Sequence, residues 1–297
     1  MITNLNNLDN LDKKLIQDSI NSNYSIKSLK NWRSFIRKRV LKQYPITPYP
    51  YKITSNNKNY KLLVCENGYE FQIKDIVNNL KFIQNSDLFP KIILNSEKFI
   101  LVEYVDGNFP NFKDKFFANY IAQTFAYFHK INLNSKKSDI ILNYYYNNKN
   151  IFEIFEINLN EIENILSRYL PNDLLYSFSY VDHNRGNYIV ASQNEIKLID
   201  LGSYLSDSIL DVNLLSSVMF KTLDQNEFWK SYKLANGSDY LYENQRILKL
   251  IATINTLINS YDRFIKAPKY DLRVKYHKKI NYQRAVRQLS LDMQNFK

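Results

Sequence analysis

Three polar side chains near residue 190 have the types and spacing that phosphoryl transfer needs. Asp182 and Asn187 precede the apolar run 188–190, and a second apolar run, 196–199, ends in Asp200. If the two runs form a β-hairpin, the Asn187 amide oxygen and the Asp200 carboxylate converge at one end of it. Such oxygens are the ligands that Mg²⁺ prefers. Asp182, on the preceding loop, could then accept the proton of an attacking hydroxyl.

The same residues have a simpler interpretation, which stays open from the sequence alone. The chain is rich in Asn, and Asp and Asn are common turn residues because their side chains hydrogen-bond the nearby backbone. In that case the three residues only cap a hairpin.

The elements that must position these residues begin with a helical extension and a strand-rich region. Residues 1–50 are expected to form two helices, with Leu8, Leu11 and Leu15 as the apolar stripe of the first, before three prolines break the pattern. Residues 51–106 alternate between strand and helix patterns. They comprise expected strands at 51–54, 60–65, 91–94 and 99–105 and an expected helix at 71–83.

Beyond Gly107 the patterns become mostly helical, at 116–131, 151–170 and from about 211 to the end. The candidate hairpin lies inside this region. The sequence therefore predicts an α+β fold with two lobes, a small mixed lobe at 51–106 and a larger helical lobe at 107–297.

The stretch 180–202 resembles the catalytic and metal-binding segments of the aminoglycoside/choline kinase family, whose pattern runs His-x-Asp-x-x-x-x-Asn and then Ile-Asp. The resemblance implies a protein-kinase-like fold with ATP and Mg²⁺ as cofactors. It makes Asp182 the catalytic base and Asn187 and Asp200 the metal ligands. Tyr180 stands at the position of the family's His and would prop the loop.

Other segments resemble the same family in the same order, over roughly residues 50 to 260. Residues 99–107 look like the strand and hinge between the lobes, where the backbone near Glu103 and Val105 would bind adenine. Residues 121–129 look like the helix that ends in Leu-Ala-x-Leu-His, and 228–232 like an aromatic patch of the helical lobe.

The pair Asp207 and Asp211 has the spacing of the family's Asp-x-x-x-Asp, which would make Asp211 a support for the catalytic loop. The two residues could equally be a helix N-cap and a surface residue. His129, at the end of the helix 121–129, is expected to be a packing residue rather than a catalyst.

Two features depart from the family pattern. The turn at 55–58, where a glycine-rich loop would cover the phosphates, has no glycine, although Asn56 and Asn57 tolerate left-handed conformations. The nearest candidate for the strand lysine that binds the phosphates is Lys61, with Glu70 or Asp75 as its acidic partner. A chain without such a lysine would be catalytically impaired.

Composition and charge bear on the cellular location of the protein and on the partners it could bind. The chain has 297 residues, a single cysteine (Cys65) and a net charge of +11. It has no apolar run long enough to span a membrane and no basic-then-apolar leader, so we expect a cytoplasmic protein. The positive charge suggests either nucleic-acid binding or simply the Lys- and Asn-rich coding of an AT-rich genome.

Basic residues crowd into residues 263–287. They could form only a solvated helical face, or they could indicate a neutral or anionic acceptor, such as a saccharide, rather than a cationic aminoglycoside. We therefore predict an ATP- and Mg²⁺-dependent phosphotransferase acting on the hydroxyl of a small molecule. The alternatives are a catalytically inactive kinase-like protein that binds nucleotide or a partner, and a scaffold whose basic surface binds nucleic acid or an anionic membrane.

Overall fold

The computed structural model describes residues 8–20, 23–29, 49–65, 68, 70–81, 87–131, 133–192, 195–202, 204–267 and 272–296. The chain divides into two compact units. Unit 1 comprises residues 1–110 and 185–204, and unit 2 comprises residues 111–184 and 205–297.

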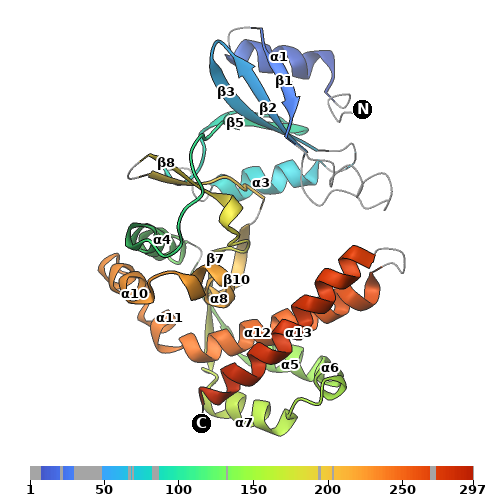
Figure 1. Ribbon diagram of the computed structural model, residues 1–297, viewed down its shortest axis with the longest axis vertical. Helices are drawn as coiled ribbons and strands as arrows, with labels where there is room; N and C mark the ends of the chain where they lie inside the picture. Colours follow the sequence, from blue (N-terminus) through green and yellow to red (C-terminus); the bar gives the residue numbers. More distant parts are fainter. Residues whose placement is uncertain are drawn as a thin grey trace. The chain divides into compact units, whose positions relative to one another are not determined.

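Unit 1 is built on an antiparallel sheet of five strands in the order β1-β2-β3-β5-β4 (Figure 1). Its elements are α1 (Asn10–Ile20), β1 (Ser25–Ser28), β2 (Tyr49–Ser55), β3 (Lys58–Val64), α3 (Phe71–Lys81), β4 (Ile92–Asn95) and β5 (Phe99–Glu103). The strands and the helix expected between residues 51 and 105 are therefore confirmed, with shifts of a few residues at their ends.

The β2–β3 hairpin closes through a two-residue turn at Asn56 and Asn57. Both residues have positive φ, 47° and 60°, and Ser55 pairs with Lys58 across the turn. This left-handed pair matches the twist of the flanking strands. Asparagine tolerates the left-handed region, which explains how this tight turn forms without glycine.

The first helix is part of unit 1 and not a separate extension. Ile16 and Ile20 of α1 join Leu8, Ile53 and Leu62 in one buried cluster. The expected apolar stripe was wrong in register: Leu11 and Leu15 are 66% and 40% exposed, whereas Asp12 is buried. Residues 25–28 form a strand beside β2, and residues 30–48, where a second helix was expected, lie outside the described part of the chain.

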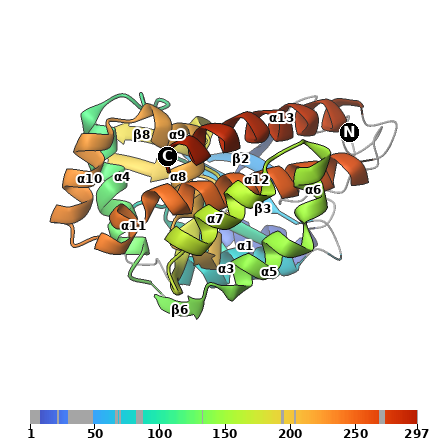
Figure 2. The ribbon, with the colours of Figure 1, turned by 90° about the horizontal axis from the view of Figure 1, so that it is seen from below.

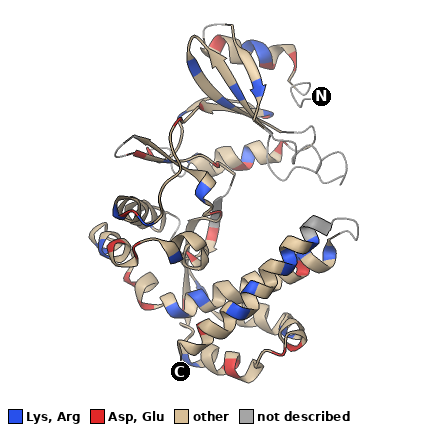
Figure 3. Ribbon diagram, viewed as in Figure 1, with Lys and Arg blue, Asp and Glu red and all other residues tan. Residues whose placement is uncertain are grey.

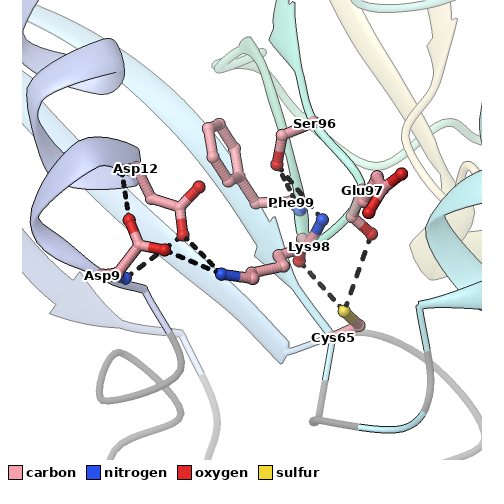
Figure 4. Close-up of polar contacts among 7 residues, drawn as sticks. All are labelled: Asp9, Asp12, Cys65, Ser96, Glu97, Lys98 and Phe99. Atoms are coloured by element: carbon pink, nitrogen blue, oxygen red, sulfur yellow. Dashed lines mark hydrogen bonds and ion pairs between the residues drawn. The ribbon is translucent and has the colours of Figure 1, made fainter.

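An ion pair explains why a carboxylate lies on the inner face of α1. Lys98, in the β4–β5 turn, reaches Asp9 at 2.9 Å and Asp12 at 3.3 Å (Figure 4). Beside it, the Cys65 Sγ–H donates to the Lys98 carbonyl at 3.1 Å, and burial raises the pKa of this thiol to about 11. Cys65 is thus a buried packing residue with a protonated thiol.

The candidate hairpin consists of β8 (Tyr188–Ser192) and β9 (Glu195–Leu198), after the short 3₁₀ turn η2 (Arg185–Asn187). It belongs to unit 1 and not, as expected, to the helical lobe. Asn108 and Val190 exchange two backbone hydrogen bonds of 3.2 and 2.8 Å, and Leu198 N–H donates to the Leu88 carbonyl at 2.8 Å. These bonds attach the hairpin to the segments on either side of β4 and β5.

Unit 2 is largely helical. Its helices are α4 (Lys115–Phe128), α5 (Asp139–Asn147), α6 (Lys149–Ile154), α7 (Leu159–Tyr169), α8 (Val212–Ser216), α9 (Val218–Thr222), α10 (Gln225–Leu234), α11 (Asp239–Glu243), α12 (Gln245–Lys266) and α13 (Leu272–Gln294). The long helices α12 and α13 lie side by side as an antiparallel pair (Figures 1 and 2). None of the helices described is long and apolar enough to cross a bilayer.

A small sheet in unit 2, of strand order β10-β7-β6, was not expected from the sequence. Its strands are β6 (Asn134–Lys137), β7 (Asp173–Tyr180) and β10 (Tyr204–Ile209). β7 leads directly into the loop that carries Asp182. With a mixed sheet unit and a helical unit, the expected α+β fold class is confirmed.

Candidate active site

The end of the β8–β9 hairpin brings Asn187 and Asp200 close together. Tyr188 pairs with Leu198. The ladder then extends by one residue, because Ile199 N–H donates a hydrogen bond of 2.9 Å to the Asn187 carbonyl. Asp200 follows at once, and its Oδ1 accepts from Gly202 N–H at 3.2 Å. The strand register therefore places the two residues side by side at one end of the hairpin, which the predicted metal site requires.

The donor set at this end suits a hard cation. It offers a carboxylate and a side-chain amide oxygen, both on half-buried residues. Within the described residues, no group of three His, Cys, Asp or Glu side chains could enclose a metal. An ion held by two protein oxygens that completes its shell with water and phosphate oxygens is the usual case for Mg²⁺.

Lys61 of β3 lies beside this pair. Its Nζ donates to the Ile199 carbonyl at 2.7 Å, one residue before Asp200. Burial lowers the pKa of Lys61, and the nearby Asp200 carboxylate opposes that shift. Lys61 thus lies on a strand, as the sequence predicted for residues 60–65.

The acidic partners suggested for Lys61 are not its partners. Glu70 Oε1 instead accepts from Gly68 N–H at 3.0 Å, and Asp75 is an exposed residue of α3. No ion pair joins Lys61 to either of them in the described structure. The electrostatic partner of Lys61 is Asp200.

The predicted hinge follows β5. Glu103 N–H donates to the Lys91 carbonyl at 2.9 Å, and Tyr104 N–H donates to the Asn59 carbonyl at 3.3 Å. Among the described residues, the Val105 N–H has no hydrogen-bond acceptor. Of these three amides, Val105 therefore has the one that can donate to a ligand.

In unit 2, Asp182 lies in the loop after β7. Its Oδ1 accepts a hydrogen bond from Asn184 Nδ2, which restricts the rotation of the carboxylate. The neighbouring His183 is buried, with its ring 5.3 Å from those of both Phe125 and Tyr180. Burial lowers the pKa of His183 to about 4, so this histidine anchors the loop as a neutral side chain.

A buried polar network centred on Asp211 contacts the end of β7, the strand that leads into this loop. The carboxylate of Asp211 is fully buried and lies 2.7 Å from His129 Nε2. It also accepts from Ser179 Oγ at 3.2 Å and from Leu214 N–H at 3.0 Å. Asp211 thereby joins the end of α4, the end of β7 and the start of α8.

The network continues beyond His129. Ser238 N–H donates to the Tyr232 hydroxyl at 3.2 Å, and that hydroxyl lies 2.7 Å from His129 Nδ1. Both ring nitrogens of His129 therefore have a buried polar partner, Tyr232 at Nδ1 and Asp211 at Nε2.

The three residues named as supports, Tyr180, Asp207 and Asp211, differ in their contacts. Asp211 is the N-cap of α8, one of the two roles left open by the sequence, and it also contacts Ser179 and His129. Tyr180 is buried at the end of β7. Asp207 has no part in this network; it is an exposed residue of β10 that forms an ion pair with Lys136 of β6. The surface-residue interpretation was the correct one for Asp207.

Sequence analysis missed the polar role of three network members, His129, Ser179 and Tyr232. His129 was expected to be only a packing residue. Both His129 and Tyr232 end segments that already showed the family resemblance, 121–129 and 228–232. The resemblance of these two segments was the only signal that the sequence offered. It could not show that His129 and Tyr232 are in contact, because the two residues are 103 positions apart.

Comparison with known proteins finds no matching family model and no matching curated protein. Solved structures do match. The streptomycin–ATP complex of APH(2'')-IIa is 16% identical, with coverage of 96% of this chain and 97% of that chain and a TM-score of 0.58. ADP-bound aminoglycoside phosphotransferase APH(2'')-Ib is 16% identical (96% and 99% covered, TM-score 0.59), and choline kinase LicA from Streptococcus pneumoniae is 17% identical (94% and 98% covered, TM-score 0.56).

At these identities the likeness establishes the fold. The chain has the protein-kinase-like fold of the aminoglycoside and choline kinase structures over nearly its whole length. The fold predicted from the motif around Asp182 is therefore confirmed.

Proposed function

We propose that this chain is a phosphotransferase that uses ATP and Mg²⁺ to phosphorylate a hydroxyl group of a small molecule. The observation that carries the proposal is that Asn187 and Asp200 flank one end of the β8–β9 hairpin, where the Lys61 ammonium group contacts the carbonyl of the residue before Asp200. The matched structures with bound ATP and ADP support the choice of nucleotide.

Unit 1 supplies the groups for nucleotide and metal binding. Val105 N–H and the Glu103 carbonyl bind the adenine edge, and Lys61 compensates phosphate charge. Asn187 and Asp200 provide oxygen ligands for Mg²⁺, which when bound neutralises the charge of the phosphates. Positioning and charge compensation are most of what phosphoryl transfer asks of a protein.

Unit 2 supplies the base. In the reaction, the acceptor's hydroxyl oxygen forms a bond to the γ-phosphorus, and the bond from that phosphorus to the β–γ bridging oxygen breaks. The hydroxyl proton passes to the Asp182 carboxylate, and ADP leaves with the electron pair of the broken bond. The Asn184 hydrogen bond limits the orientations that this carboxylate can adopt.

For the acceptor, we propose a neutral or anionic saccharide rather than a polycation. The basic residues of α12 and α13 belong to the same unit as Asp182. Their positive potential lowers the local concentration of a polycationic aminoglycoside and does not oppose a neutral or anionic sugar.

Phosphate transfer from ATP to a panel of sugars, sugar phosphates, choline and aminoglycosides tests the proposal. Replacing Asp182 with Asn keeps the shape of the side chain but removes the base, so turnover should fall by about 100-fold or more. Asp207→Asn is the matched control, since Asp207 is an exposed aspartate of unit 2, and it should leave turnover unchanged.

Two results would contradict the proposal in separate ways. Wild-type protein that binds ATP but phosphorylates no acceptor would instead be a catalytically inactive nucleotide-binding protein, in line with its glycine-free β2–β3 turn. Preference for a cationic aminoglycoside would overturn the acceptor class and leave the reaction intact.

A further inference from the structure

The positive charge of this protein is concentrated at its C-terminal end. Residues 245–297 contain 12 Lys and Arg but only 3 Asp and Glu, whereas the preceding 244 residues contain 28 and 26. The rest of unit 2 is acidic, with 10 basic against 14 acidic residues in 111–184 and 205–244. Coding bias would spread lysine along the whole chain, so it does not explain this distribution.

Ten of these twelve basic residues lie on the α12–α13 helix pair, which we call the basic hairpin (Figure 3). Four of its cationic residues are exposed and form no ion pair with any other described residue: Arg263, Lys279, Arg284 and Arg287. Lys266, in contrast, is paired with Asp262. The hairpin thus presents positive charge that the described structure does not neutralise.

Exposed apolar side chains lie near the same end of the hairpin. The apolar stripe of α12 is buried at Ile254 and Ile258 but continues to Ile265, which is 59% exposed. On α13, near the start of the helix, Tyr276 is 63% exposed. Both lie within a few residues of the connection between the two helices, close in sequence to Arg263 and Lys279.

We propose that the basic hairpin docks this protein onto an anionic lipid bilayer surface. Lys and Arg near the surface are attracted to anionic headgroups, while exposed aliphatic and tyrosine side chains insert at the boundary between headgroups and acyl chains. A nucleic acid would also attract the charges, but its hydrated phosphate backbone offers nothing to an exposed isoleucine. The proposal does not depend on the proposed reaction.

Flotation of the full-length protein with vesicles tests the docking surface. Phosphatidylcholine vesicles that contain phosphatidylglycerol should bind the protein, and vesicles of phosphatidylcholine alone should not. The triple variant Arg263→Glu, Lys279→Glu, Arg284→Glu should lose at least about tenfold in affinity for the anionic vesicles. A matched triple variant, Lys115→Glu, Lys149→Glu, Lys230→Glu, changes the net charge equally on exposed residues elsewhere in unit 2 and should bind as wild type does.

A second variant separates lipid from nucleic acid. Ile265→Ser leaves every charge in place and alters an exposed side chain, so folding is preserved; vesicle binding should weaken, most visibly at high salt, where charge attraction is screened. Equal binding to both vesicle types, equal losses in the two triple variants, or displacement from vesicles by an RNA or DNA oligonucleotide with no effect of Ile265→Ser would each overturn the proposal.

Discussion

Asp211 is a fully buried carboxylate that accepts hydrogen bonds from Ser179 and Leu214 and lies 2.7 Å from His129. In Asp211→Asn, one acceptor oxygen becomes a donor and faces groups that already donate. We expect a loss of roughly 2–4 kcal/mol in unfolding free energy, because buried donors are left unsatisfied. Urea denaturation measures this loss.

Asp207→Asn provides the comparison on the same β10–α8 segment. Asp207 is exposed and its ion pair with Lys136 is solvated, so this change should alter the unfolding free energy by less than about 1 kcal/mol. Equal losses in the two variants would show that the Asp211 network does not support the fold.

His183 predicts a pH dependence of stability. Burial holds its pKa at about 4 in the folded protein, below the ordinary value of 6.5. The unfolded chain therefore binds this proton more tightly, so the stabilisation is complete above pH 6.5 and is lost as the pH falls towards 4. The whole effect is roughly 3 kcal/mol for a shift of this size.

His183→Gln should flatten the pH dependence of the unfolding free energy across that window, as measured by urea denaturation at several pH values. His277→Gln, at an exposed histidine of α13, should leave the wild-type slope. A slope that survives in His183→Gln would mean that other groups produce it.

At the scale of elements, Gly107 allows the close approach of the segment after β5 to β8. A Cβ on Gly107 would lie 2.2 Å from the Val190 carbonyl oxygen and 2.7 Å from Ile189 Cγ2, whereas a Cβ on Gly186 would meet nothing within 4 Å. Gly107→Ala should therefore destabilise the protein by about 2 kcal/mol or more in thermal or urea denaturation. Gly186→Ala should be nearly neutral, and similar effects in both would contradict this account.

Secondary-structure elements were predictable from the sequence where a pattern among neighbouring residues specified them. The β2–β3 hairpin and the approach of Asn187 to Asp200 depend on neighbouring residues, and both followed from alternation and turn chemistry. β7 was missed even though Tyr176, Phe178 and Tyr180 alternate with serines along it. The prediction of which face of α1 is buried was wrong. Asp12 can be buried because it forms an ion pair with Lys98, which is far away in the sequence.

Contacts between distant segments were not predictable in the same way. Lys61 is separated by 138 residues from Ile199, whose carbonyl it contacts. The sequence identified the strand of this lysine but could not show its partner, since nothing local to β3 specifies it. The same holds for the contacts of Asp211 with His129 and Ser179.

At the scale of the whole molecule, the boundary between the two units divides the proposed catalytic motif along the chain, between Asn184 and Arg185. Asp182 thus belongs to unit 2, and the proposed metal ligands belong to unit 1. Asp182→Asn should therefore abolish transfer but leave Mg²⁺-dependent ATP binding intact, as measured by calorimetry beside the turnover assay. Loss of ATP binding in this variant would contradict the division of roles.

The central claim is that Asn187 and Asp200 form a metal site for a nucleotide. Its most direct test is calorimetric titration of ATP, with and without Mg²⁺, into wild type, Asp200→Ala and the control Asp18→Ala, which changes an exposed aspartate of α1. Wild type and the control should bind ATP much more tightly with Mg²⁺, and Asp200→Ala should lose that dependence. Absence of ATP binding by the wild type, or an unchanged Mg²⁺ dependence in Asp200→Ala, would contradict the account.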